Sequence, residues 1–295
     1  MSGTLSPFSS VAILGPGLLG GSVALAVRRY LPDMEIRLWA RRRAPLDEAA
    51  AMSITPHLFT DISSAVAGAE LIILATPVGC FEDLSVRMLP SIAPGALVTD
   101  VGSVKAYVHR TSGALLHAHG VSFIGSHPMA GSEKQGLSAA CQDLFIGAGI
   151  VLTNDQEAPP ELLNRLAAFW TALGGRCLNM EAGLHDRTVA RISHVPHVLA
   201  ALCARNAVAD GNQKDLRELA STGFRDTTRV CSGAPGMWAD ILWENDVAVR
   251  KSLSSCVDDL RELSRLLETQ DKAGVERWLA NARSAREQIL FPREK

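Results

Sequence analysis

A glycine-rich turn near the N-terminus restricts the fold of this chain more than any other feature of its sequence. It reads GPGLLG at residues 15–20, with the spacing GxGxxG, and joins an apolar run at 11–14 to a helical stretch at 18–29. In such a turn the first glycine bends the chain, the second lets backbone N–H groups approach a pyrophosphate, and the third lets helix and strand pack closely. The order of strand, turn and helix predicts a dinucleotide site. Its expected contacts are Gly15, Gly17, Leu18, Leu19 and Gly20.

Short apolar runs alternate with helical stretches through the first 180 residues. Strands are expected at 11–14, 35–39, 71–75, 96–99 and 121–124, with further strands at 150–153 and 176–180 and a helix at 161–173. This alternation predicts an α/β fold with a Rossmann-type, doubly wound parallel sheet. Ligands of such sheets bind beyond the carboxyl ends of the strands, so we also assign Thr76 and Pro77 to the cofactor site.

The second half of the chain has little β signal. After Glu181, the stretches expected to be helical are 183–209, 214–222, 238–268 and 271–290. We therefore predict a dinucleotide-binding domain over 1–180 and an all-helical domain over 181–295. One apolar helix face is formed by residues at steps of three and four, namely Leu253, Val257, Leu260, Leu263 and Leu267. That face is expected either in the core or at a dimer seam.

Composition excludes several classes of protein. Hydrophobic residues make up 47% of the 295 residues and charged residues 20%, which argues for a packed core and against disorder. The 29 Lys and Arg nearly balance the 31 Asp and Glu, so no nucleic-acid partner is expected. Glycine and proline interrupt the uncharged stretch 11–27, so no membrane span is expected. The six cysteines form no CxxC pair and no signal sequence is visible, which favours a cytoplasmic protein.

The residues after the second expected strand bear on the choice of cofactor. An NAD site normally has a carboxylate there, about 20 residues beyond the glycines, that binds the ribose hydroxyls. This chain reads WARRR at residues 39–43, without an acid. A guanidinium can pair with a 2′-phosphate, so we favour NADP, keep NAD as the alternative, and assign Arg41 and Arg42 to the cofactor. The other interpretation is that these arginines form an exposed loop.

Four further clusters carry polar residues suited to chemistry. They read DVGSVK at 100–105, SHPMAGSEK at 126–134, SHVPH at 193–197 and GFRDTTR at 223–229, and Trp238, Asp240 and Asn245 follow the last. Ser103 and His127 both come just after an expected strand, so the parallel sheet would bring them together at a nicotinamide.

Taken in this order, GPGLLGGS, DVGSVK, SHPMAGSEK, SHVPH and GFRDTTR resemble the prephenate/arogenate dehydrogenase family of tyrosine biosynthesis, from about residue 11 to about residue 245. The resemblance implies an N-terminal Rossmann domain and a C-terminal helical dimerisation domain that forms a homodimer. It also implies oxidative decarboxylation of prephenate to 4-hydroxyphenylpyruvate with hydride transfer to NAD(P). Oxidation of arogenate to tyrosine is the alternative.

The same resemblance assigns roles to individual residues. His127 would be the catalytic base for the ring hydroxyl of the substrate, and Ser103 would hydrogen-bond the same centre near the nicotinamide. Arg229 would bind a substrate carboxylate, for which its forked guanidinium is suited. The expected substrate pocket also contains Ser132, Glu133, His185, Ser193, His194 and His197. No metal is expected, because aromatisation drives the decarboxylation and His194 and His197 lack a third ligand nearby.

Other interpretations of these residues remain open. His127 could be an ordinary turn histidine, and Arg225 could replace Arg229 at the substrate. The remaining histidines are expected at the surface, namely His57, His109, His117 and His119. Another hydroxyacid or imine dehydrogenase would use a lysine of the helical domain, and neither Lys214 nor Lys251 stands in a motif. A non-catalytic dinucleotide sensor would need only the glycine turn.

Overall fold

The computed structural model describes residues 6–131, 134–209 and 213–290. The chain divides into two compact units, of which the larger ends at Asp246 and the smaller starts at Val247. The boundary that we predict near residue 180 lies inside the larger unit, and it stays a prediction. No helix in the described ranges is long and apolar enough to cross a membrane.

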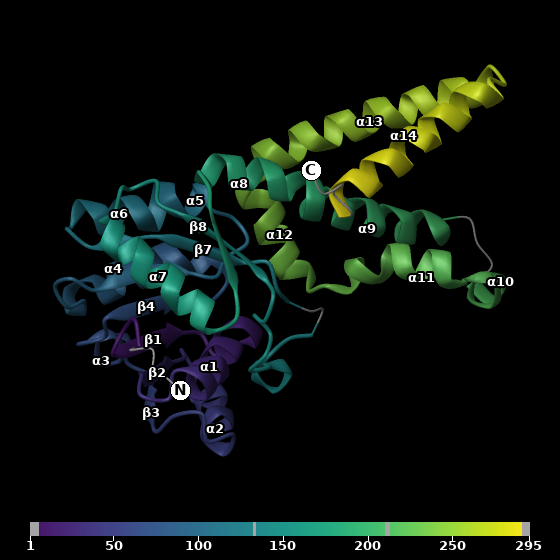
Figure 1. Ribbon diagram of the computed structural model, residues 1–295. Coiled ribbons are helices and arrows are strands. Elements are labelled where there is room, and N and C mark those ends of the chain that lie inside the picture. The colour runs from purple at the N-terminus through teal and green to yellow at the C-terminus, as the bar shows by residue number, and fades with distance from the viewer. Residues whose placement is uncertain (1–5, 132–133, 210–212, 291–295) are drawn as a thin grey trace. The chain divides into compact units, whose positions relative to one another are not determined.

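A six-stranded parallel sheet forms the centre of the N-terminal part (Figure 1). Its strands run in the order β3-β2-β1-β4-β5-β6, with bounds β1 (Ser10–Leu14), β2 (Glu35–Trp39), β3 (His57–Phe59), β4 (Leu71–Leu74), β5 (Leu97–Asp100) and β6 (Ser122–Phe123). The predicted doubly wound parallel sheet is confirmed, with β3 as an added strand that the sequence did not indicate.

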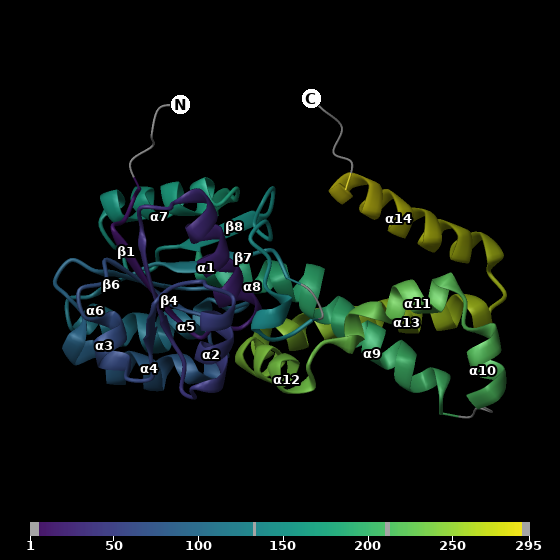
Figure 2. The ribbon, with the colours of Figure 1, turned by 90° about the horizontal axis from the view of Figure 1, so that it is seen from below.

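Helices cover both faces of this sheet (Figure 2). Alternating side chains of β1 point to opposite faces, so Val11 and Ile13 join one apolar core while Ala12 and Leu14 join the other. The first core lies against α1 (Leu18–Tyr30) and α7 (Pro160–Ala172), and the second against α3 (Ile62–Val66), α4 (Phe81–Met88) and α6 (Ala114–Ala118). The remaining helices of this part are α2 (Ala44–Ala51) and α5 (Ala106–Val108). Burial on both faces explains why β1 and β4 read as continuous apolar runs.

A second sheet of three strands corrects part of the sequence prediction. It is built from β7 (Gly125–Pro128), β8 (Gly149–Thr153) and β9 (Arg176–Asn179), with β8 antiparallel to β7 and parallel to β9. The strands expected at 150–153 and 176–180 are present as β8 and β9, but they do not belong to the large parallel sheet. The placement of His127 just after a strand is wrong, because it lies within β7 opposite Val151. Only Ile124 separates β6 from β7, and the sequence does not reveal that the chain changes sheets there.

The rest of the larger unit is helical, as predicted. It contains α8 (Ala182–Val189), the π-helical turn η5 (Ala190–His194), α9 (Val195–Ala207), α10 (Gln213–Leu219), α11 (Thr222–Thr228), the 3-10 turn η6 (Arg229–Ser232) and α12 (Pro235–Glu244). Pro196 lies inside a helical run that continues without a break from α8 through η5 into α9, and the wide π-helical turn directly before it accommodates the N–H that proline lacks. The helix expected at 238–268 is interrupted at Asn245, which follows α12 and caps it.

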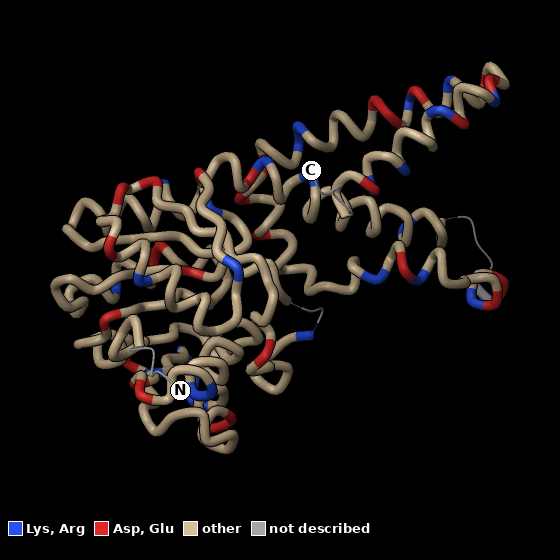
Figure 3. The backbone as a smooth tube through the Cα atoms, in the orientation of Figure 1, with Lys and Arg blue, Asp and Glu red and all other residues tan. Residues whose placement is uncertain are grey.

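The smaller unit consists of α13, which starts at the last residue of the larger unit (Asp246–Glu268), and α14 (Lys272–Leu290). The two helices meet where the Leu266 side chain lies close to Gly274, leaving little room for a side chain there. Both carry acidic and basic residues along their length (Figure 3). On α13 the side chains of Val257, Leu260 and Leu267 are exposed in the single chain, so this part of the apolar stripe is not core within it.

Candidate active site

The glycine turn after β1 leaves an open surface of backbone. Gly15 has φ of 112°, a left-handed conformation that favours glycine, and its N–H donates to the carbonyl of Trp39. A Cβ at Gly20 would lie 2.1 Å from the Gly15 oxygen, so only glycine allows α1 to approach so closely. A Cβ at Gly17 would meet nothing within 4 Å. The turn therefore presents open backbone at the start of α1, where Leu18 and Leu19 begin the helix without a side-chain cap.

The end of β4 lies directly against this turn. Thr76 follows the strand, and its Cγ2 would be 2.9 Å from a Cβ placed on Gly15. Pro77 is exposed beside it. The β1 and β4 turns therefore meet where the strand order reverses, which is the usual ligand position in a doubly wound sheet.

The arginines after β2 are exposed. Arg43 pairs with Asp47 one helical turn away, with Nε 2.8 Å from the carboxylate. Arg41 and Arg42 stand at the carboxyl end of β2, the position at which dinucleotide sites bind the adenosine ribose.

A buried ion pair shapes the loop that carries Ser103. Asp100 ends β5 and accepts a hydrogen bond from the Lys105 ammonium, and both side chains are fully buried. The Asp100 carboxylate also accepts from the backbone N–H of Gly102 at 2.8 Å and of Ser126 at 3.1 Å. Burial lowers the pKa of Lys105, although Asp100 opposes the shift. Asp100 thus fixes the Ser103 loop against the strand that holds His127.

His127 and His185 form a hydrogen-bonded pair inside the larger unit. His127 Nδ1 lies 2.8 Å from His185 Nε2, and the rings meet edge to face. His185 stands on α8, and its other nitrogen, Nδ1, is 2.7 Å from the carboxylate of Asp186. All three side chains are buried. The hydrogen bond between the two histidines thereby connects β7 of the second sheet to α8.

The chain of polar contacts continues to two more of the predicted histidines. The Asn245 amide donates to the backbone carbonyl of Asp186 at 2.9 Å and lies 3.1 Å from His194 Nδ1. His194 also meets the edge of the Trp238 ring. Trp238 stacks on His197 with ring centroids 3.5 Å apart. Four predicted histidines therefore belong to one connected cluster.

The remaining predicted substrate residues are less closely defined. Arg229 begins η6, which packs against α9, and its side chain is exposed. Ser193 is half-buried in η5, next to His194. Ser132 and Glu133 lie outside the described residues.

Comparison with known proteins identifies the family. A family model described as the nucleotide-binding domain of prephenate dehydrogenase matches residues 23–179, and a second, described as its dimerization domain, matches residues 181–281. The chain belongs to the prephenate dehydrogenase family.

Members of this family match nearly the whole chain. Cyclohexadienyl dehydrogenase of Zymomonas mobilis is 33% identical, over 90% of this chain and 91% of that protein. The crystal structure of prephenate dehydrogenase from A. aeolicus, in complex with hydroxyphenyl propionate and NAD+, has a TM-score of 0.88 at 27% identity and covers 95% of this chain and 98% of its own. Synechocystis arogenate dehydrogenase has a TM-score of 0.81 at 30% identity, covering 95% and 100%. The predicted Rossmann-type domain followed by a helical domain is confirmed.

Burial controls the charge of two histidines of the cluster, His127 and His194. It holds the pKa of His127 well below its ordinary value, and the like charges of His185, Lys105 and His194 add to the effect. Burial also lowers the pKa of His194 to about 4. Both rings are therefore neutral near pH 7, so His127 is in the form that can accept a proton.

Sequence reasoning missed several buried polar groups around the cluster. It gave no role to Lys105, Asp186 or Glu244, and it placed His109 at the surface. His109 is in fact buried, with Nε2 2.7 Å from Thr153 Oγ1 and Nδ1 hydrogen-bonded to Gln156. The available signal for Asp186 was its position directly after His185, which the resemblance assigns to the substrate pocket.

Glu244 ends α12 near the turn that follows β4. Its Oε1 would lie 3.5 Å from a Cβ on Gly79, in the turn after β4. Its Oε2 is buried without a hydrogen-bond partner among the described residues. Burial and the neighbouring Asp240 raise the pKa of Glu244 to about 7, against the opposing charge of Lys105.

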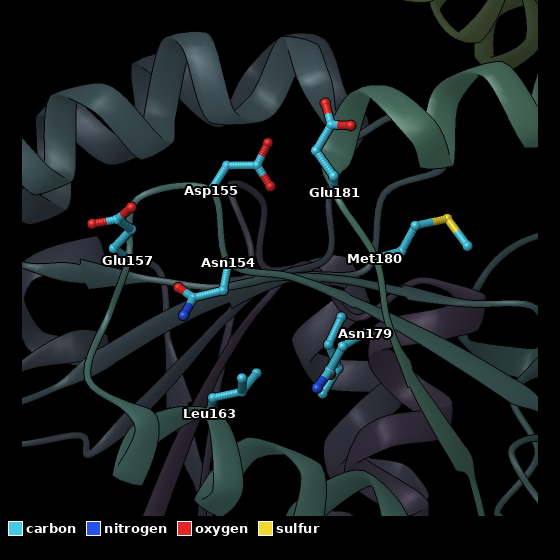
Figure 4. A pocket seen from close by; sticks show the side chains of 8 residues that line it. Asn154, Asp155, Glu157, Leu163, Asn179, Met180 and Glu181 are labelled. Carbon is cyan, nitrogen blue, oxygen red and sulfur yellow. The ribbon is translucent and has the colours of Figure 1, made fainter.

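A groove of about 570 Å³ lies elsewhere, between β8, β9 and α7. Figure 4 shows its acidic side chains, Asp155, Glu157 and Glu181, beside Asn154 and Asn179. Asp155 accepts a hydrogen bond from the N–H of Ala182, at the start of α8. The groove is open to solvent, and its lining shares no residue with the histidine cluster.

Proposed function

We propose that this protein oxidatively decarboxylates prephenate to 4-hydroxyphenylpyruvate, with hydride transfer to NADP. The observation that carries the proposal is the buried, neutral His127, which is held through Nδ1 by His185 and so keeps Nε2 for a substrate hydroxyl. Membership of the prephenate dehydrogenase family supports the reaction, and the open glycine turn supports the cofactor.

Different residues of the chain have different roles in the proposed reaction. His127 accepts the proton of the ring hydroxyl, and Ser103 hydrogen-bonds the same oxygen. The nicotinamide, when bound, accepts the hydride from the carbinol carbon. The ketone that forms is conjugated with the carbon bearing the ring carboxylate, so it draws the electrons released as carbon dioxide leaves, and the product is aromatic. The ring oxygen, left as a phenolate by that step, takes back the proton that His127 had accepted, so the product is the phenol and no further acid is needed.

In this proposal, most of the residues that bind the substrate lie in the helices after residue 181. Arg229 pairs with a substrate carboxylate, since an arginine fork matches a carboxylate in a bidentate manner. The other proposed pocket residues are Ser132, Glu133, His185, Ser193, His194 and His197. A homodimer is proposed as well, because the matching family model describes residues 181–281 as a dimerization domain.

The proposed preference for NADP rests on Arg41 and Arg42. Both are exposed at the end of β2, where a carboxylate would favour NAD. The A. aeolicus relative was crystallised with NAD+, so NAD remains the alternative here. Replacing both arginines by alanine is expected to raise KM for NADP about tenfold or more while KM for NAD changes little. Equal changes for the two cofactors would contradict the assignment.

Initial rates test the reaction directly. Purified protein is assayed with prephenate or arogenate and with NADP or NAD, while reduced cofactor and carbon dioxide are followed. The prephenate and NADP pair is expected to give the highest kcat/KM. An equal or higher value with arogenate would replace prephenate by arogenate, the substrate named for the Synechocystis relative. Absence of turnover with both would refute the proposal.

Arg229→Ala tests the substrate site separately. It is expected to raise KM for the substrate strongly, because a charged hydrogen-bond donor to a carboxylate is worth about 1.5–3 kcal/mol. The Kd for NADP should stay within about twofold. A variant in which only cofactor binding weakens would contradict the assignment of Arg229 to the substrate.

A further inference from the structure

Asp186 is the most heavily hydrogen-bonded carboxylate of the histidine cluster. Its Oδ1 is 2.7 Å from His185 Nδ1 and accepts from the backbone N–H of Lys105 at 2.8 Å, while its Oδ2 accepts from the N–H of Ala106 at 2.9 Å. Its own backbone carbonyl accepts from Asn245. A carboxylate held by this many donors cannot easily turn.

These contacts determine which histidine nitrogen carries a proton. A carboxylate only accepts hydrogen bonds, so His185 must place its proton on Nδ1, facing Asp186. In the neutral ring Nε2 is then an acceptor, and the 2.8 Å contact requires that His127 donate from Nδ1. His127 is left with a bare Nε2.

We propose that Asp186 is a positioning residue that acts through His185 on His127, fixing the tautomer in which Nε2 of His127 is the proton acceptor. The inference rests on the proposed function for the identity of the reaction, but not for the proton positions themselves. It assigns to Asp186 a role that the sequence did not indicate.

The same chain stabilises the charge that forms during the reaction. When Nε2 of His127 takes a proton from the substrate hydroxyl, the ring becomes an imidazolium. Its Nδ1–H then donates a stronger hydrogen bond to His185, which is itself bonded to the Asp186 carboxylate. The negative charge of Asp186 thereby offsets part of the penalty that burial places on protonated His127.

Other charges around the pair do not replace this effect. Lys105 faces His127 from the β5 side, but its positive charge disfavours protonation and is paired with Asp100. His194 faces it from η5 and disfavours protonation as well. Glu244 acts electrostatically on Lys105, and its carboxylate lies near Gly79 in the turn after β4.

Nitrogen NMR of histidine-labelled protein tests the tautomer without any turnover. In the unmodified chain, His127 is expected to show a protonated Nδ1 and a bare Nε2. In Asp186→Asn, an amide group meets the three N–H donors, and the His127 signal should show the other tautomer or a mixture. A His127 tautomer unchanged by Asp186→Asn, or already of the opposite kind in the unmodified chain, overturns the proposal. The exposed Asp83→Asn on α4 is the matched control.

Kinetic measurements then distinguish a positioning role of Asp186 from a folding defect of the variant. Asp186→Asn is expected to lower kcat by about 100-fold or more, with the acid limb of the kcat/KM profile moved to lower pH and NADP binding unchanged. An unmoved pH profile with normal kcat overturns the proposal.

Two His185 variants keep the test decisive if Asp186→Asn folds poorly. Glutamine can still accept from Nδ1 of His127, whereas methionine cannot. His185→Gln should retain at least tenfold higher kcat than His185→Met, and equal values overturn the proposal. If the protein oxidises neither prephenate nor arogenate, the proposed function fails while the NMR result still decides the proton positions.

Discussion

The glycine turn and the histidine cluster are both candidate parts of one active site, yet they are built in opposite ways. The turn works through missing side chains, since a Cβ at Gly20 would collide with backbone and one at Gly17 would meet nothing. The cluster works through buried polar side chains, of which His127, His185 and His194 have hydrogen-bond partners, because an unpaired polar group is costly away from water. Variants of the turn should therefore act through shape, and variants of the cluster through protons and hydrogen bonds.

The largest expected effect comes from the cluster. His127→Asn keeps a polar side chain that can hydrogen-bond near the position of Nδ1, but it removes the ring nitrogen Nε2 that accepts a proton. We expect kcat to fall about 10²–10⁴-fold, the usual contribution of a general base, with Kd for NADP within about threefold of the unmodified protein. Steady-state rates with prephenate and cofactor titration by fluorescence measure the two quantities.

The exposed His117→Asn, on α6, provides the control and should leave kcat unchanged. If His127→Asn retained more than a tenth of kcat, or lost cofactor binding to the same extent as activity, the contrast between turn and cluster would fail.

Two glycines of the turn give the next largest effect. Gly20→Ala places a methyl group 2.1 Å from the Gly15 oxygen, so we expect it to lower the free energy of unfolding by about 1–3 kcal/mol, as overpacking does. Gly17→Ala should change it by less than about 0.5 kcal/mol, because the methyl group meets no protein atom.

The second half of this prediction concerns binding. The methyl group of Gly17→Ala would stand where a pyrophosphate approaches the backbone, so affinity for NADP should fall although stability does not. Thermal unfolding and isothermal titration measure the two effects. Normal NADP affinity in Gly17→Ala would show that the cofactor does not pass over this residue.

The same contrast explains what the sequence could and could not reveal. The glycine turn is recognisable because its three roles fall within six consecutive residues, between a strand and a helix of regular pattern. The parallel sheet is recognisable because burial on both faces leaves nearly continuous apolar runs such as β4. Both features are local in the chain.

The cluster is not local. His127 and His185 are 58 positions apart, and Asn245 reaches Asp186 across 59. The resemblance to the family identified the histidines of the site from the sequence. Only the fold shows that Asp186 is hydrogen-bonded to His185 and that His109 is buried. The change of sheet at β7 was hidden for a similar reason, because pairing with β8 depends on residues more than 20 positions further along the chain.

Glu244 connects the two regions and gives the smallest effect that we predict. It lies near Gly79 in the turn after β4, and it acts electrostatically on Lys105 beside the cluster. Its pKa is raised from 4.5 to about 7, chiefly by burial. A carboxyl group whose pKa is raised by folding stabilises the folded state below its unfolded pKa, and this contribution is lost as the pH rises through the folded value. Glu244→Gln, which does not titrate, should therefore be no more stable than the unmodified protein at pH 4.5 but more stable at pH 8.

The size of that difference is limited because Glu244 is only half-buried. Allowing for screening by solvent, we expect on the order of 1 kcal/mol at pH 8, or about 2–4 °C in Tm. Thermal unfolding of the cofactor-free protein at several pH values measures it, with the exposed Glu48→Gln on α2 as the control. If the Tm difference between Glu244→Gln and the unmodified protein did not change between pH 4.5 and pH 8, Glu244 would not be a buried acid in solution. The region between turn and cluster would then be open to water, and the electrostatic connection between them would be lost.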